Sequence, residues 1–213
     1  MKLGVLISGR GSNLGAILDA IAAGRLAAEV ALVVSNKAGA GGLARAEAAG
    51  VRTLVLAHTA YADRAAFDAA MALALREAGV DTVVLAGFMR IVTKVLLDAF
   101  PDRVVNIHPS LLPAFPGIDA QAQALAHGAR ITGCTVHLVD PGTDTGPILG
   151  QAAVPILEGD DREALAARIL AREHELLIAA LGWLAAGNVE VVEGPRRTAR
   201  VAGSRTFFGL EGP

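Results

Sequence analysis

The amino-acid sequence predicts an α/β protein with a doubly wound, mostly parallel sheet. Short apolar runs rich in β-branched residues alternate with alanine-rich runs of helical character over most of the chain. The apolar runs are nearly uninterrupted, as expected of strands that are covered on both faces of a sheet. Beyond Pro116-Gly117 the alternation is looser, and there we expect antiparallel strands toward the C-terminus.

The first half of the chain is expected to contain strands and helices in strict alternation. Gly24, Gly50 and Gly79 each follow a helical pattern, a place where glycine commonly ends a helix. The expected strands are 3–7, 30–35, 52–56, 81–86 and 103–108, and the expected helices are 13–23, 43–49, 61–78 and 93–99.

The second half is expected to hold two paired strands and a long helix. The strands at 132–139 and 148–156 can pair antiparallel across the loop at 140–146. Helices are expected at 119–126 and 160–186, and a short edge strand at 189–192. No repeat, low-complexity tract or linker interrupts the chain, so we expect one domain over 1–213, with halves at about 1–100 and about 101–190 and a tail of undetermined structure at 194–213.

Composition excludes several classes of protein. Hydrophobic residues make up 53% and charged residues 19%, which excludes a disordered chain. A net charge of −2 offers no field that attracts nucleic acid or an acidic membrane, and Arg196, Arg197 and Arg200 are interpreted as part of a solvated tail. The single cysteine, Cys134, excludes an internal disulfide, and the scattered histidines indicate no metal site. Since no signal peptide or membrane-spanning run is visible, we expect a soluble cytoplasmic protein.

Two polar residues, Asn106 and His108, alternate at the end of the strand expected at 103–108. Alternate side chains of a strand share a face, and Pro109 should end the strand at the edge where open α/β sheets bind ligands. An imidazole carries protons near neutral pH, and an amide can donate to a developing oxyanion. A purely structural histidine is the alternative interpretation.

The turn at 8–13 lies between the first strand and the first helix. Its glycines allow a tight turn, Ser12 or Asn13 can cap the helix, and free N–H groups at a helix start favour a phosphate. The spacing matches neither a dinucleotide fingerprint nor a P-loop, so a phosphate monoester fits better. A tight turn without a ligand is the alternative.

The loop at 87–91 follows the fourth expected strand. Phe88, Met89 and Ile91, if exposed beside Arg90, would suit a flat, partly apolar ligand with acidic ends. Ordinary packing of this loop onto the core is the alternative.

The loop at 140–147 can hold a carboxylate because its glycines and prolines favour an irregular backbone. An aspartate facing His108 would favour the charged imidazolium. Alternatively, Asp140 and Asp144 only form Asx turns, and His137 either lines the same site or is a core histidine with satisfied hydrogen bonds.

Together these segments resemble the folate-dependent formyltransferase family. The resemblance is carried by Ile7-Ser-Gly-Arg-Gly-Ser-Asn13, Leu85-Ala-Gly-Phe-Met-Arg90, Asn106-Ile-His-Pro-Ser-Leu-Leu-Pro113 and Asp144-Thr-Gly-Pro147, in the family's order. It implies a Rossmann-like formyltransferase fold and transfer of the formyl group of 10-formyltetrahydrofolate to the amine of a glycinamide ribotide in purine synthesis. It also implies small-molecule substrates, a folate cosubstrate in place of a tightly bound cofactor, no metal, and no nucleic-acid or membrane partner. A monomer and a homodimer both remain open.

The resemblance also implies roles for individual residues. His108 would transfer protons, Asn106 would bind the formyl oxygen, and Asp144 would favour the protonated form of His108. Gly11, Ser12 and Asn13, in the half at about 1–100, would hold the phosphate of the ribotide. Glu173, on the long helix, would contact its glycinamide part. The folate would contact Arg64, Met89, Arg90, Ile91, Val92 and Asn106, with the loop at 140–144, Asp140 included, closing over its pterin.

This sequence departs from the family at one place. Members often carry a histidine near 119 or 121, where this chain has Asp119 and Gln121, so substrate contacts from this segment are in question. Two alternative functions stay open: a formyltetrahydrofolate hydrolase, which uses water as acceptor, and a non-catalytic nucleotide-binding module that uses only the turn at 8–13. The net charge argues against a member that binds tRNA.

Overall fold

The computed structural model describes residues 1–203 and 206–208, and within these the chain forms two compact units. The first is Met1–Asn106 and the second begins at Ile107. The sequence predicted one domain with two halves that meet near residue 100, and the single domain stays a prediction.

The first unit is built on parallel strands. They are β1 (Lys2–Ile7), β2 (Glu29–Ser35), β3 (Thr53–Val55), β4 (Thr82–Leu85) and the first part of β5 (Val104–His108). Hydrogen bonds join them in the order β5, β4, β1, β2, β3, and every pair is parallel. β4 and all but the first residue of β1 are buried, which agrees with their uninterrupted apolar sequences.

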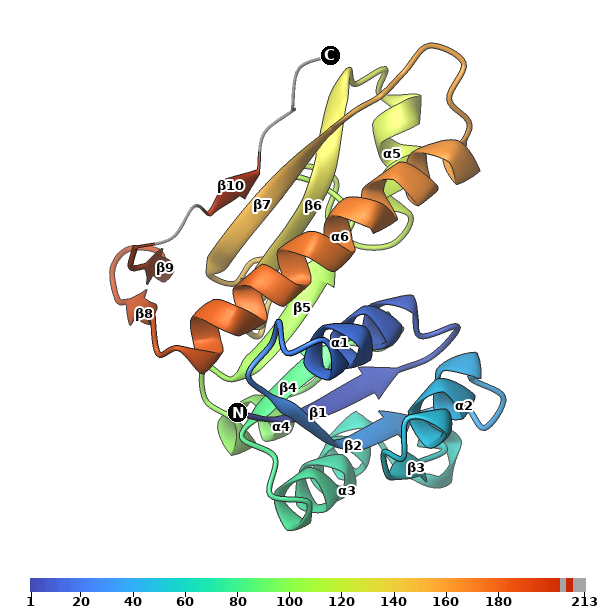
Figure 1. The fold of residues 1–213 in the computed structure, drawn as a ribbon, viewed down its shortest axis with the longest axis vertical. Coiled ribbons are helices and arrows are strands. Elements are labelled where there is room, and N and C mark those ends of the chain that lie inside the picture. The colour runs from blue at the N-terminus through green and yellow to red at the C-terminus, as the bar shows by residue number, and fades with distance from the viewer. Residues whose placement is uncertain (204–205, 209–213) are drawn as a thin grey trace. The chain divides into compact units, whose positions relative to one another are not determined.

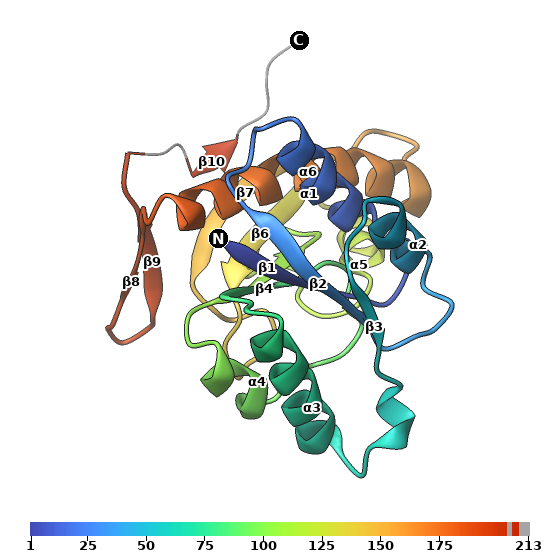
Figure 2. The same cartoon turned by 60° about the horizontal axis from the view of Figure 1, so that its bottom comes forward.

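Helices cover both faces of this parallel sheet. α1 (Ser12–Ala22) and α2 (Gly41–Ala48) lie on one face, and α3 (Arg64–Glu77) and α4 (Lys94–Ala99) lie on the other (Figures 1 and 2). α3 begins three residues later than predicted, after the short 3-10 turn η1 (His58–Ala60), because Asp63 caps it by accepting the Ala66 N–H at 2.8 Å.

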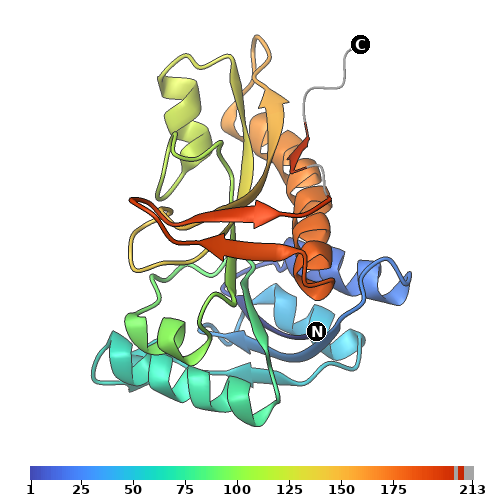
Figure 3. The same ribbon diagram turned by 90° about the vertical axis from the view of Figure 1, so that its left-hand side faces the viewer.

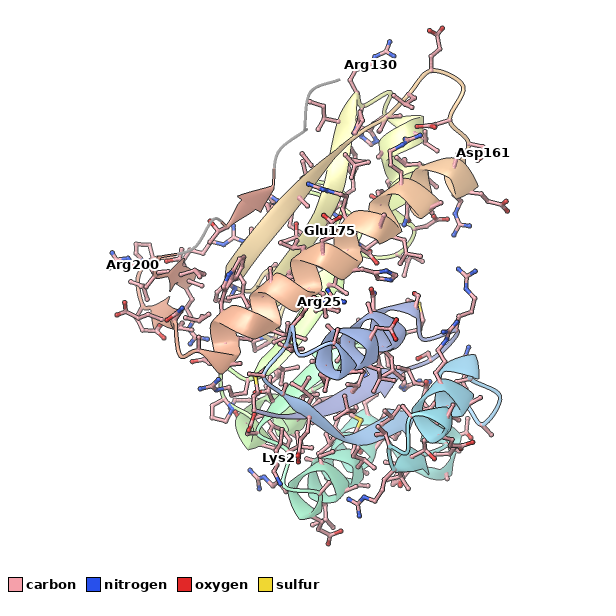
Figure 4. The ribbon with its side chains drawn as sticks, viewed as in Figure 1. Lys2, Arg25, Arg130, Asp161, Glu175 and Arg200 are labelled. Carbon is pink, nitrogen blue, oxygen red and sulfur yellow. The ribbon has the colours of Figure 1, made fainter. Side chains whose placement is uncertain are left out.

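The second unit pairs two long antiparallel strands beneath the longest helix. β6 (Ile131–Leu138) and β7 (Ile148–Pro155) are antiparallel, as predicted, and α6 (Arg162–Ala185) packs along both (Figure 1). Asp161 stands at the first end of α6 (Figure 4) and caps it by accepting the Ala164 N–H at 2.8 Å. α5 (Ala120–Ala126) precedes β6, and the strand order in this unit is β10, β7, β6, β5.

The C-terminal segment differs from the sequence prediction. β8 (Val189–Val192) was expected as a short edge strand, but it forms a separate two-stranded sheet with β9 (Thr198–Val201), visible as an antiparallel hairpin in Figure 3. The second strand was missed because its charged residues and the preceding arginines suggested a solvated tail. A third strand, β10 (Phe207–Phe208), runs parallel to β7. Within the tail at 194–213, residues 204–205 and 209–213 lie outside the described residues.

The fold-class prediction is confirmed. The strands of the first unit are parallel between two layers of helices, and the antiparallel pair follows toward the C-terminus. Among the described residues, no helix combines the length and the apolar character needed to cross a membrane.

Candidate active site

The turn after β1 presents the start of α1. Gly11 has a φ of 70°, and a Cβ at this position would lie 2.6 Å from the Cα of Gly42, so both conformation and space require glycine. Gly11, and not Ser12 or Asn13, occupies the N-cap position, so the capping role predicted for those side chains is wrong. No side chain caps the helix, which leaves its first N–H groups suited to an anion.

Ser8 links this turn to the loop that follows β4. Its hydroxyl donates to Oδ1 of Asn36 at 2.7 Å and accepts the N–H of Met89 at 2.9 Å. The Ser8 N–H also donates to the carbonyl of Gly87 at 3.2 Å. The predicted phosphate turn and the predicted folate loop therefore lie side by side in the first unit.

The loop after β4 exposes only some of its apolar side chains. Met89 is 70% exposed and Ile91 57%, as predicted, whereas Phe88 is buried, so its predicted exposure is wrong. Val92 is also buried. The guanidinium of Arg90 lies 5.6 Å from the centre of the Phe67 ring on α3, near Arg64 at the start of that helix. The predicted folate residues of the first unit are thus neighbours.

Asn106 stands at the carboxyl edge of the same sheet. It pairs in register with Leu85, the last residue of β4, and its side chain is only partly buried. This places its amide beside the beginning of the loop at 87–92, as the sequence predicts for strands that end at one edge.

His108 and Asp144 meet in the second unit. Nδ1 of His108 lies 3.4 Å from Oδ2 of Asp144, and Nε2 lies 2.9 Å from the carbonyl oxygen of Phe115. Both ring nitrogens face oxygen acceptors, and only an imidazolium has a proton for each. The ring is therefore held from both sides, by the Asp144 carboxylate and by the Phe115 carbonyl.

Asp144 is also held by the backbone of Gly117, which the sequence analysis did not identify, and lies beside His137, which it left with two interpretations. Its Oδ2 accepts the Gly117 N–H at 2.8 Å, and its Oδ1 lies 3.7 Å from Nε2 of His137. Burial by itself raises the pKa of this carboxyl group, but the bonds from His137 and Gly117 and the charge of His108 outweigh burial and hold the pKa below its usual range. Asp144 is consequently an ionised carboxylate between two imidazoles.

The loop that carries Asp144 is braced from two sides. Oδ1 of Asp140 accepts the Gly142 N–H at 3.1 Å, an Asx turn, and the hydroxyl of Thr145 at 2.6 Å. From the C-terminal hairpin, Nη2 of Arg196 donates to the carbonyl of Thr145 at 3.1 Å. Arg196 is exposed, in agreement with its interpretation as a solvated residue, but it also contacts the loop beside Asp144.

A small polar network fixes the segment after His108. The hydroxyl of Thr135 on β6 donates to the carbonyl of Ser110 at 2.7 Å and accepts the Leu112 N–H at 3.0 Å. Nε2 of Gln151 on β7 donates to Thr135 and to the carbonyl of Leu112. Because these hydrogen bonds come from two paired strands, β6 and β7, they determine where the chain turns after His108.

Two further positions named in the sequence analysis are Glu173 and Asp119. Glu173 is buried on α6 beside β6, where burial first and the Glu173 charge second raise the pKa of the Cys134 thiol. The carboxylate of Asp119, at one of the two positions where the sequence departs from the family pattern, binds Nε of Arg162 at 2.7 Å. In this chain Asp119 ties its loop to the start of α6.

These structural features agree with the comparison with known proteins. The family model described as formyl transferase matches residues 1–181. The chain belongs to this family. The predicted resemblance is confirmed, although the match ends before Arg196 and the C-terminal hairpin.

Individual relatives narrow the comparison. The phosphoribosylglycinamide formyltransferase of Escherichia coli (strain K12) is 41% identical over 193 residues, which cover 91% of both proteins. The crystal structure of glycinamide ribonucleotide transformylase 1 from Symbiobacterium toebii superposes with a TM-score of 0.91 at 53% identity, covering 94% of this chain and 93% of that one. The human trifunctional purine biosynthetic protein adenosine-3 is 44% identical, and this chain spans only 19% of its length.

Sequence reasoning identified His108 and Asp144 but missed several of their neighbours. Gly117 contributes only a backbone N–H, which no sequence pattern marks. His137 was left with two interpretations, and its place beside Asp144 favours the one in which it lines the site. Within the described residues there is no group of three or more potential metal ligands from histidine, cysteine, aspartate or glutamate.

Proposed function

We propose that this chain transfers the formyl group of 10-formyltetrahydrofolate to the amine of phosphoribosylglycinamide. The products would be formylglycinamide ribonucleotide and tetrahydrofolate, a step of purine biosynthesis. The observation that carries the proposal is the His108–Asp144 pair in a formyl transferase whose relatives of similar length bear this enzyme's name. The folate is a cosubstrate in place of a resident cofactor, and the proposed location is the cytoplasm.

The ribotide phosphate is assigned to the start of α1. Gly11 lets the backbone turn, and the N–H groups of Ser12 and Asn13 stand at the positive end of the helix dipole. Glu173 would contact the glycinamide part of the same substrate.

The folate is assigned to the loop at 89–92, to Arg64 and to the loop that carries Asp140. Exposed Met89 and Ile91 offer apolar contact area, while the two arginines suit the anionic groups of the folate. Asp140 would act through the shape of its loop, since it accepts hydrogen bonds from Gly142 and Thr145 of that loop.

The chemistry requires a donor for negative charge and a carrier for protons. When the amine attacks the formyl carbon, the formyl oxygen becomes an oxyanion, which the side-chain N–H of Asn106 would stabilise. The attacking amine loses a proton and the leaving folate nitrogen gains one, and His108 would mediate this exchange. Asp144 would keep the imidazolium oriented and charged, as its position 3.4 Å from Nδ1 supports.

Release of tetrahydrofolate tests the proposal. The purified protein is mixed with 10-formyltetrahydrofolate, with and without phosphoribosylglycinamide, and tetrahydrofolate is followed with time. We expect release only with the ribotide, in equal amount to the formylated ribotide. Release without the ribotide would identify a hydrolase, and ribotide binding without any turnover would identify a nucleotide-binding module.

A further inference from the structure

Asp68 is a buried carboxylate that the proposed chemistry does not use. It lies on α3, only 2% of its surface is exposed, and its Oδ2 accepts the backbone N–H of Thr93. Thr93 is the residue that follows the loop at 89–92. A buried carboxylate is costly unless it is hydrogen-bonded or paired, so its position calls for a reason.

Two arginines lie close enough to act on this carboxylate. Burial raises the pKa of Asp68, whereas the hydrogen bonds from Thr93 and then the charges of Arg90 and Arg64 act to lower it. Arg90 stacks on the ring of Phe67, the residue next to Asp68 on α3. The Asp68 carboxylate therefore binds the residue that follows the folate loop and is under the influence of the charges of both arginines assigned to the folate.

The loop is attached at its two ends by buried side chains from different elements. The hydroxyl of Ser8, after β1, holds the N–H of Met89, and the carboxylate of Asp68, on α3, holds the N–H of Thr93. Between these two attachments Met89 and Ile91 are the exposed residues. The loop is thus fixed through its backbone while its side chains remain accessible to a ligand.

We propose that Asp68 is a positioning residue for the folate: it holds the end of the loop at 89–92 and orients Arg64 and Arg90 without touching the ligand. A fixed loop loses less conformational entropy on binding, and a fixed negative charge near two arginines favours side-chain positions close to it. This inference rests on the proposed function, because it assumes that the loop binds the folate.

The experiment compares Asp68→Ala and Asp68→Asn with the wild type. The alanine variant loses both the hydrogen bond to Thr93 and the charge, whereas the asparagine variant keeps an oxygen for the Thr93 N–H. Asp98→Ala is the matched control, since Asp98 is an exposed carboxylate on α4 that pairs with Lys94. For each protein we measure the Kd of tetrahydrofolate by calorimetry, the KM of both substrates, kcat and Tm.

We expect Asp68→Ala to weaken tetrahydrofolate binding and to raise the folate KM about tenfold, with the ribotide KM within about twofold of wild type. The tetrahydrofolate Kd and the folate KM of Asp68→Asn should lie between those of Asp68→Ala and the wild type. Both values for Asp98→Ala should equal those of the wild type. A purely structural role predicts a lower Tm with unchanged folate affinity in the folded fraction, and that result would overturn the inference.

Two further outcomes remain decisive. If Asp68→Ala does not fold, Asp68→Asn carries the test, and tetrahydrofolate affinity equal to that of the wild type would reject the positioning role. If the wild type itself neither binds tetrahydrofolate nor turns over, the proposed function fails, and the inference fails with it. Normal wild-type activity with normal folate binding in both Asp68 variants rejects only the inference.

Discussion

Nδ1 of His108 and Oδ2 of Asp144 are separated by 3.4 Å, although these residues are 36 positions apart in the chain. The carboxylate is positioned by the Gly117 N–H and stands beside a second imidazole, that of His137. The imidazole of His108 therefore lies between the Asp144 carboxylate on one side and the Phe115 carbonyl on the other. This relationship is the basis of the first prediction.

His108→Ala and Asp144→Asn should not have independent effects on turnover. We expect each variant to lower kcat by about 10²-fold or more, because each disables the same proton carrier. The double variant should lose little beyond the larger single loss, as found when residues act as one unit. Steady-state kinetics of the three variants measures this coupling. Losses that simply multiply would show that the two residues act separately.

Asn106→Ala should reduce kcat and leave ribotide binding nearly unchanged. A side-chain donor to an oxyanion is needed mainly in the transition state, and its removal costs about 3–4 kcal/mol in comparable acyl transfers, or about 10²–10³-fold in rate. Asn188→Ala, at an exposed position after α6, serves as the control. An unchanged kcat in Asn106→Ala would eliminate the oxyanion role.

The carboxylates of Asp144 and Asp68 should give opposite pH dependences of stability. The folded-state pKa of Asp144 is lowered, so the unfolded chain binds more protons just below the ordinary value of 3.8, and the stabilisation is lost as the pH falls through the folded-state pKa. The pKa of Asp68 is raised, so the folded chain binds more protons above 3.8 and stability declines as the pH rises through that window.

Urea unfolding of the wild type, Asp144→Asn and Asp68→Asn between about pH 3 and pH 6 measures both effects. The stability advantage of the wild type over Asp144→Asn should grow as the pH rises. The difference in free energy of unfolding between the wild type and Asp68→Asn should shift in the opposite direction, against the wild type, as the pH rises. If both stability differences changed in the same direction with pH, the environments assigned to Asp144 and Asp68 would be contradicted.

Gly146→Ala should destabilise the protein and impair catalysis together. A Cβ at this position would lie 1.9 Å from the carbonyl oxygen of Leu138, so the loop that carries Asp144 must move. Overpacking of this kind costs about 1–3 kcal/mol. Gly182→Ala is the control: its Cβ meets nothing within 4 Å in the interior of α6, and we expect about 0.5–1 kcal/mol of added stability. Thermal melts and kcat measure the two variants.

Arg196→Ala should lower kcat modestly without loss of the fold. The substitution removes the hydrogen bond to the carbonyl of Thr145, which is worth about 0.5–1.5 kcal/mol, or about a two- to tenfold effect. Arg200→Ala, on β9 of the same hairpin (Figure 4), should have no effect on kcat. Equal kinetics for the two variants would show that the hairpin does not steady the loop.

The features that are local in the chain could be predicted from the sequence. Apolar runs with β-branched residues and alanine-rich segments indicate strands and helices through short-range preferences, and the fold class follows from their alternation. Asn106 and His108 could be placed together because they are alternate residues of one strand that a proline ends. The turn at 8–13 followed from its position between a strand and a helix.

Other features depended on contacts between residues that are distant in the chain. Packing, which has no local signature in the sequence, decides three such features. They are the burial of Phe88, the pairing of β8 with β9, and the attachment of the folate loop by Ser8 and Asp68. The contact between Arg196 and the carbonyl of Thr145 could not be predicted either, because it depends on the C-terminal hairpin.

By itself, the sequence determined the alternation of elements, the family resemblance and the polar pair at the end of β5. Only the tertiary structure decided that the Asp144 carboxylate reaches His108, that His137 and Gly117 share it, and that Asp68 stands behind the folate loop. The physical reason is that backbone preferences act over a few residues, whereas a hydrogen bond between side chains of separate elements exists only after those elements have packed.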